Sequence, residues 1–176
     1  MRFARVDTPI GTLTLVGGDA GLRAVLFAGE APPAGAVEGA HPVLDAAAGQ
    51  LREWFAGKRT GFDLPLDLDG ATPFQRRAWL ALAEVPYATT RSYGAQARTL
   101  EAPRAARAVG AANGRNPLPI VLPCHRLVGA DGALTGFGGG LDVKRALLAH
   151  EAATAARADG AGTTRTRMSP ALPPRT

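Results

Sequence analysis

Hydrophobic and polar residues alternate along three short stretches at the start of the chain, residues 2–8, 11–17 and 21–28. Leu13 and Leu15, for example, are separated by threonine, which is the period-two pattern of a half-buried strand. Glycine-containing turns separate the three stretches. The pattern therefore predicts three consecutive strands in a short antiparallel sheet.

The pattern then becomes helical. Residues 29–40 are rich in alanine, glycine and proline and are expected to form a loop, whereas Pro42 to Phe55 carries apolar residues at helical spacing. Residues 62–68 alternate again and predict a further strand. We place a domain boundary at Gly70-Ala71, so that residues 1–71 form a small α/β domain, which we interpret as a scaffold because it lacks a chemical motif.

A second, mainly helical region follows. Thr72-Pro73 is a strong helix start, since threonine is a favoured N-cap and proline is favoured in the first turn. Ser92 caps a short helix that is expected to reach Leu100, and another helix is expected from Ala102-Pro103 to Asn113-Gly114. Two short helices with a tight break between them predict a helix-turn-helix.

The rest of the chain contains less regular structure. Three prolines in residues 114–123 exclude a helix there, and residues 126–135 are expected to form a short hairpin around a glycine-rich turn. A final helix is expected from Leu141 to about Glu151. The predicted fold is thus α/β (α+β), with a scaffold domain at 1–71, a mainly helical domain at 72–153 and a disordered basic tail at 154–176.

Composition limits the protein class. The 176 residues are 46% hydrophobic, which is normal for a globular protein, and no apolar run approaches the ~18 residues of a membrane span. The first residues lack an apolar signal core, so secretion is not expected. We expect a cytoplasmic monomer in which a thiol stays reduced.

Charge divides the chain unevenly. Residues 1–71 hold six basic and nine acidic side chains, whereas residues 72–151 hold ten basic and five acidic ones. The basic excess favours a polyanionic partner for the second region, although an ordinary basic surface gives the same count.

The helix expected from residue 104 to 112 is unusual because its residues are nearly all alanine or glycine apart from Arg104, Arg107 and Val109. Small residues allow close approach to a bulky partner. Close helix–helix packing is one explanation, and docking into a nucleic-acid groove is the sharper one, since the only large polar side chains are arginines.

Cys124 is the only cysteine and lies in Pro123-Cys124-His125-Arg126. A single cysteine excludes an intrachain disulfide and a thiolate metal cluster. A nucleophilic thiol needs a base and a group that orients the base. His125 is the nearest base; Glu151 and Asp142 could orient it, and His150 could supply another base.

These motifs together resemble the O6-alkylguanine-DNA alkyltransferases over roughly residues 72–151. The cysteine motif, the following glycine-rich loop and the end of the last helix occur in the order and register of that family. The segments that carry the resemblance are Thr72-Pro73-Phe74-Gln75, Arg91-Ser92-Tyr93-Gly94, Asn116-Pro117-Leu118-Pro119-Ile120, Pro123-Cys124-His125-Arg126, Gly138-Gly139-Gly140-Leu141 and Leu147-Leu148-Ala149-His150-Glu151.

The resemblance implies a reaction without a cofactor or a metal. An O6-alkylguanine, and usually an O4-alkylthymine, is flipped out of double-stranded DNA, and its alkyl group moves irreversibly to the cysteine, once per molecule. By motif, Cys124 is the nucleophile, His125 the water-mediated base and Glu151 its orienting group. Asn116 positions the active-site segment, and Tyr93 donates a proton to guanine and helps to rotate the phosphate.

The resemblance also implies a DNA surface and a base pocket. Arg107 is the finger that fills the space of the flipped base, and the small-residue helix lies in the minor groove. Further DNA contacts are expected from Arg104, Ala105, Ala106, Gly110, Asn113, Thr72 and Gln75. The substrate pocket is expected to include Pro119, Leu127, Phe137, Gly138 and Gly139.

Two departures from the family pattern concern the pocket. Phe137-Gly138 stands where some relatives have Tyr-Ser, so side-chain hydrogen bonds to guanine are lost and Gly138 leaves more room for larger alkyl groups. Asn113 replaces a bulkier residue of some members. Zinc-bearing relatives use N-terminal cysteines, which this sequence lacks.

Three other functions fit the sequence less well. A damage-binding protein of the alkyltransferase-like type lacks the nucleophilic cysteine that is present here. A cysteine hydrolase leaves Arg107 and the charge asymmetry unexplained. A transcriptional regulator reads base edges in the major groove, and the small-residue helix offers few side chains for that purpose.

Overall fold

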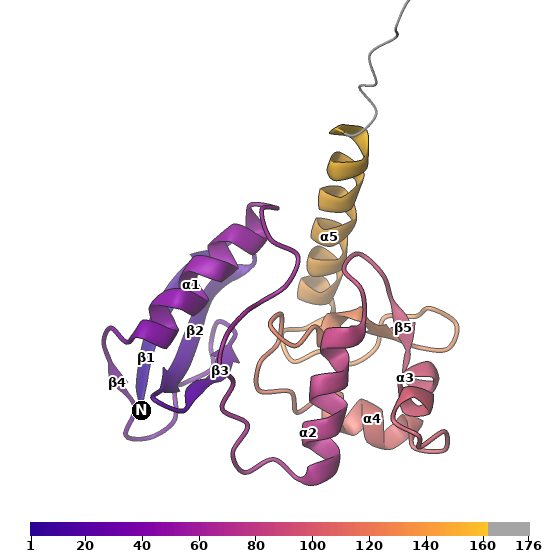
Figure 1. Ribbon diagram of the computed structural model, residues 1–176, viewed down its shortest axis with the longest axis horizontal. Helices are drawn as coiled ribbons and strands as arrows, with labels where there is room; N and C mark the ends of the chain where they lie inside the picture. The colour runs from indigo at the N-terminus through magenta and orange to yellow at the C-terminus, as the bar shows by residue number, and fades with distance from the viewer. Residues whose placement is uncertain (162–176) are drawn as a thin grey trace, which may run out of the picture.

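The N-terminal region is a four-stranded sheet covered by one helix. The computed structural model describes residues 1–161 (Figure 1). The three predicted strands are confirmed as β1 (Arg2–Thr8), β2 (Gly11–Gly18) and β3 (Gly21–Leu26), paired antiparallel. The short β4 (Val37–Glu38) lies within the predicted loop and pairs parallel with β1, so the sheet is mixed, in the order β3-β2-β1-β4.

Helix α1 (Pro42–Phe55) has the predicted limits. His41 caps it by accepting a hydrogen bond from the Val43 amide, and proline occupies the first turn. The helix packs against the sheet, and its apolar residues Leu44 and Leu51 are fully buried. Apolar packing between one sheet face and one helix therefore holds this region together.

The strand predicted at residues 62–68 is wrong. This segment is extended but forms only an isolated bridge between Leu66 and Leu22. The Leu22 amide bonds to the Pro65 carbonyl and the Asp67 amide bonds to the Leu22 carbonyl. Pro65 itself has no amide hydrogen, so a continuous ladder cannot form through it.

The second region starts with α2 (Pro73–Leu80), which begins at the predicted cap. Thr72 and Gln75 form a reciprocal capping box. A 3₁₀ turn (Ala81–Glu84) follows and ends before Pro86. Trp79 then donates its indole hydrogen to the Ala112 carbonyl at 2.7 Å and so fixes α2 against a later helix.

That later helix is α4 (Ala106–Asn113), which follows α3 (Tyr93–Thr99). Ser92 caps α3 as predicted. The break between the helices contains Glu101 in the left-handed region, with φ 57°. Helix α4 starts later than predicted because residues after Pro103 form a turn. Two short packed helices joined by a tight turn fit the expected helix-turn-helix.

The hairpin predicted at residues 126–135 is also wrong. The strand β6 (Leu127–Val128) pairs in parallel with β5 (Arg91–Ser92), which precedes α3. Residues 129–133 close a turn through the Gly129 amide and the Ala133 carbonyl, but no second strand follows. The partner of β6 is distant in sequence, so local turn residues could not reveal it.

The last helix is longer than predicted. Helix α5 spans Leu141–Ala161, so residues 154–161 of the predicted disordered tail are helical. Alanine, the best helix former, dominates this extension, and buried Thr154 packs beside Gly57 at the end of α1. The remainder of the predicted tail, residues 162–176, lies outside the described residues.

The two regions touch along β3 and α5. The Val25 amide in β3 donates to the Pro117 carbonyl at 2.9 Å, and His150 of α5 bonds to the Trp54 carbonyl at 2.9 Å. Within residues 1–161, no helix combines the length and hydrophobicity that a membrane crossing requires.

Candidate active site

Cys124 begins a short 3₁₀ turn, Cys124–Arg126, and is only 3% exposed. Two asparagines hold the backbone around it. Asn116 donates to the Leu122 carbonyl at 2.8 Å and accepts from the Leu118 amide, and Asn113 donates to the Cys124 carbonyl at 3.3 Å. The proline-rich segment is thus fixed by side chains where it lacks regular backbone pairing.

The thiol is protonated at neutral pH in this environment. Burial raises the pKa of Cys124 to about 11, against smaller opposing effects from a hydrogen bond with Asn116 and from the charge of Lys144. The thiolate is the nucleophilic form. A base must therefore take the proton as the reaction proceeds.

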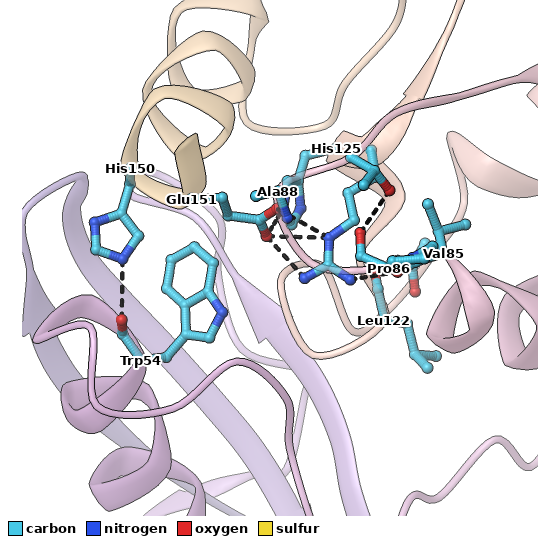
Figure 2. Close-up of polar contacts among 11 residues, drawn as sticks. Trp54, Val85, Pro86, Ala88, Leu122, His125, His150 and Glu151 are labelled. Carbon is cyan, nitrogen blue, oxygen red and sulfur yellow. Dashed lines mark hydrogen bonds and ion pairs between the residues drawn. The ribbon is translucent and has the colours of Figure 1, made fainter. Parts of the chain in front are cut away.

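His125 is the candidate base beside Cys124, and Glu151 bonds to it. The His125 Nε2 atom lies 2.8 Å from the Glu151 carboxylate, and both residues are fully buried (Figure 2). A carboxylate only accepts hydrogen bonds, so Nε2 carries the proton and Nδ1 presents a lone pair. Among the described residues, buried Nδ1 has no partner.

Burial lowers the pKa of His125 below its usual value, although Glu151 opposes that shift. The imidazole is therefore neutral at pH 7 and can accept a proton. The stabilisation of the resulting imidazolium depends on the Glu151 charge.

Glu151 is held as a carboxylate by further contacts. Burial favours its neutral form, but hydrogen bonds from His125 and Arg126 outweigh that effect and keep its pKa below the usual value. Arg126 donates to both carboxylate oxygens at 2.8–3.1 Å, and the Ala88 amide donates at 2.9 Å. Arg126 also donates to the Val85 carbonyl at 2.7 Å.

The other residues considered beside Cys124 lie elsewhere. Asp142 is exposed and pairs with Arg145 on the surface. His150 points away from Glu151 toward the Trp54 ring, as Figure 2 shows, and bonds to the Trp54 carbonyl. Of the three, only Glu151 contacts His125.

Two buried cations were not singled out from the sequence. Arg126 belongs to the Pro123-Cys124-His125-Arg126 motif, but nothing in the sequence pattern indicated that its side chain turns inward. Lys144 is fully buried and donates to the Leu127 and Thr135 carbonyls at 2.6 and 2.8 Å. The sequence feature that could have revealed its burial is its position on the apolar face of the last helix, three residues before Leu147.

Tyr93 lies at the start of α3 beside this cluster. Its hydroxyl donates to the Thr135 carbonyl over 3.4 Å, a long bond, and its ring lies 5.9 Å from the Lys144 ammonium. The side chain is half-buried, so its hydroxyl can exchange this weak partner for another.

A cavity of about 160 Å³ opens beside Cys124. Four other predicted residues line it: Asn113, Asn116, Pro119 and Gly138. The N-terminal region, interpreted from sequence as a scaffold, supplies a second wall that was not predicted. The residues of that wall are Val25, Leu26, Phe27 and Glu30.

The remaining residues assigned to the substrate pocket do not line the cavity. Leu127 is fully buried. Phe137 packs edge-to-face on Phe27, with ring centroids 5.5 Å apart, and Gly139 lies against the same ring.

The residues expected to bind DNA fall mainly on and around α4. Arg104 and Arg107 are exposed, whereas Ala105, Ala106 and Gly110 are half-buried. Asn113 is buried in the cavity wall, and the side chains of Thr72 and Gln75 cap α2. No group of three or more potential ligands among His, Cys, Asp and Glu that could hold a metal occurs in residues 1–161.

Two protein families match nearly all of both regions. Residues 73–153 match the family described as 6-O-methylguanine DNA methyltransferase, DNA binding domain. Residues 1–68 match 6-O-methylguanine DNA methyltransferase, ribonuclease-like domain.

Individual relatives agree with these matches. The chain is 51% identical over 154 residues to a methylated-DNA–protein-cysteine methyltransferase of Mycolicibacterium paratuberculosis, covering 86% of this chain and 92% of that protein. A protein of the same name from Methanosarcina acetivorans is 44% identical over 153 residues, covering 84% and 96%.

Solved structures show the same likeness. The structure of Mycobacterium tuberculosis OGT in complex with DNA superposes with a TM-score of 0.81 at 45% identity, covering 88% of this chain and 94% of that one. Sequence and fold thus agree along both regions, and this chain belongs to the 6-O-methylguanine DNA methyltransferase family.

Proposed function

We propose that this protein repairs O6-alkylguanine in DNA by moving the alkyl group irreversibly to its own Cys124, once per molecule. O4-alkylthymine is a second substrate. The observation that carries the proposal is the buried Cys124–His125–Glu151 arrangement beside a cavity, with His125 Nδ1 free to accept a proton. Close relatives are named methylated-DNA–protein-cysteine methyltransferase.

The reaction steps follow from the protonation states of Cys124, His125 and Glu151 before the reaction. A water molecule passes the Cys124 proton to His125 Nδ1, and the Glu151 carboxylate stabilises the imidazolium. The sulfur attacks the alkyl carbon, the bond from that carbon to O6 breaks, and its electron pair remains on the guanine. Tyr93 donates a proton to the departing guanine, and the proton from His125 restores the tyrosine hydroxyl through water.

The net change exchanges one proton for one alkyl group: the thiol becomes a thioether and the alkylated base becomes guanine. The equation balances without a cofactor. Asn116 maintains the path of the segment that carries the thiol, through its bonds to Leu118 and Leu122. A thioether has no proton to return, so a second turnover is not possible.

The alkylated atom is inaccessible inside the base stack, so the base must leave the duplex. We assign the approach to α4, whose small residues allow close contact with the minor groove. Exposed Arg107 fills the space of the flipped base, and Arg104 contacts the phosphate backbone. The protein acts as a monomer in the reducing cytoplasm, where Cys124 stays a free thiol.

The decisive experiment measures the intact protein mass after incubation with duplex DNA that contains O6-methylguanine. We expect one added methyl group per molecule, located on Cys124, and none in Cys124→Ala. DNA binding without a gain in mass would instead support a damage sensor. More than one repaired base per protein molecule would rule out the single-use mechanism.

A second experiment tests the assignment of Arg107. Unstacking a base costs a few kcal/mol, and about 1.4 kcal/mol corresponds to a tenfold change. Arg107→Ala should therefore slow repair in duplex DNA by about tenfold or more, with little effect on reaction with free O6-alkylguanine base. Arg52→Ala, an exposed arginine on α1, is the matched control. Equal losses on both substrates would contradict the finger role.

A further inference from the structure

The wall of the Cys124 cavity that comes from the N-terminal region contains one aromatic side chain, Phe27. It follows directly after β3, the strand that lies nearest the second region (Figure 1). Opposite it, the cavity is lined by Cys124, Asn116 and Pro119, which belong to the fixed active-site segment. The reactive sulfur and Phe27 thus border the same small space, although they are almost one hundred residues apart in sequence.

Phe27 is fixed on several sides. Its amide donates to the Glu30 carboxylate at 2.6 Å, and the Glu30 amide donates back to the Phe27 carbonyl at 3.1 Å. Its ring contacts Phe137 edge-to-face. The ring also lies so close to Gly139 that a Cβ atom there would be 2.9 Å from it.

The backbone that carries Phe27 is tied to the segment that carries Cys124. The hydrogen bond from the Val25 amide to the Pro117 carbonyl joins β3 to residues 114–123. The distance across the cavity is therefore set by a direct contact between the two regions. A wall that is held in this way resists displacement better than an independent loop.

The cavity is small for the base that it has to accept. Ligand pockets typically measure about 300–1,000 Å³, whereas this one measures about 160 Å³. A bulky substituent on the base must therefore displace part of the wall. Arg115 is exposed at the rim and can turn into solvent, and Gly138 has no side chain. Of the residues that line the cavity, Phe27 is the one aromatic side chain and the bulkiest apolar obstacle.

We propose that Phe27 is a specificity-determining residue that limits the size of the alkyl group transferred to Cys124. This inference rests on the proposed function and adds the N-terminal region to substrate selection. Replacing the ring with a small side chain removes the obstacle without touching the thiol, its base or α4. The consequence is a change in the ratio of rates for large and small alkyl groups.

The test compares single-turnover rate constants for duplexes that contain O6-methylguanine or O6-benzylguanine, followed by intact mass. Differences of one or a few carbon atoms in an apolar pocket alter rates by about 10–200-fold. Phe27→Ala should therefore raise the benzyl-to-methyl rate ratio at least about tenfold, and Phe27→Trp should lower it. Phe3→Ala is the matched control, since Phe3 lies on β1 and does not line the cavity.

The outcomes are separable. If the wild-type protein takes up no methyl group, the proposed function fails. If it does, and a folded Phe27→Ala has an unchanged ratio, only the present inference is overturned. An equal loss of both rates with a lower melting temperature would show that Phe27 is structural. If Phe27→Ala does not fold, Phe27→Leu keeps most of the packing and should still raise the ratio.

Discussion

The two regions of this protein bury different kinds of side chain. Among residues 1–71, all of which the structure describes, Thr14 is the only buried polar side chain, and the core consists of apolar residues from α1 and the sheet. Besides the Cys124 thiol, the second region buries four ionisable side chains around the active site: His125, Arg126, Lys144 and Glu151. One region is stabilised by apolar packing, and the other also contains a charged network.

The difference indicates what each region is selected to do. Buried ion pairs are often no more stabilising than apolar groups of the same size, so stability alone does not explain the network. Its arrangement fixes one His125 tautomer and keeps Glu151 ionised beside it. We infer that the second region accepts an energetic cost in order to prepare a base, while the first supplies a stable support and one wall of the cavity.

Removing the Glu151 charge should have the largest effect. In Glu151→Gln, the His125 imidazolium loses its stabilising carboxylate, and general-base catalysis is typically worth about 10²–10⁴-fold. We expect the alkylation rate to fall by at least about 10²-fold. Arg126 also loses its buried partner, at about 3–5 kcal/mol of stability. Single-turnover kinetics and denaturant unfolding measure the two effects.

Asp142→Asn is the matched control for that variant. Asp142 is an acid on the same helix, but it is exposed and pairs with Arg145 on the surface. It should change neither the rate nor the unfolding curve appreciably. A Glu151→Gln rate close to that of the wild type would contradict the role of the network.

An apolar deletion in the first region should affect stability alone. Leu44 is fully buried on α1 and lies away from the cavity. Leu44→Ala should lower the free energy of unfolding by about 2–5 kcal/mol through lost packing and a new cavity. The alkylation rate of the folded fraction should stay within about twofold of the wild type, because effects at distant sites are usually independent. A large loss of rate at a temperature where the variant remains folded would show that the division between the regions is too simple.

The sequence predicted the first region from local patterns and the second from its motif. The limits of β1 and α1, and β2 to within one residue, followed from alternation and a proline start, because these elements bury one face against their neighbours. The strand expected at 62–68 failed because Pro65 interrupts pairing.

Contacts between residues far apart in sequence explain which features of the second region could not be predicted. The pairing of β5 with β6 joins residues 91–92 to 127–128, and no local pattern encodes such a partner. The contact of Glu151 with His125 was one of several open possibilities from spacing, and the resemblance selected it. No sequence pattern indicated that Phe27 lines the cavity, because this depends on how the two regions pack together.

The buried thiol predicts a specific loss of stability at high pH. A group whose pKa is higher in the folded state stabilises the fold below its unfolded pKa, and this contribution is lost as the pH rises toward the folded value. For Cys124 the window runs from 9.0 to about 11. Compared with Cys124→Ser, the wild-type protein should lose on the order of 2 kcal/mol across it. Unfolding curves at several pH values measure this; parallel curves for the two proteins would contradict a buried neutral thiol.

The smallest expected effect compares neighbouring residues on α5. Glu151 faces the reacting thiol's base, whereas His150 faces the first region and bonds to the Trp54 carbonyl. His150→Phe keeps a ring against Trp54 but loses that hydrogen bond, whose net contribution is about 0.5–1.5 kcal/mol. We expect a stability loss of about 1 kcal/mol and an unchanged alkylation rate. If the rate also falls, the contact between the regions positions Glu151, and the first region would then contribute to catalysis through the helix.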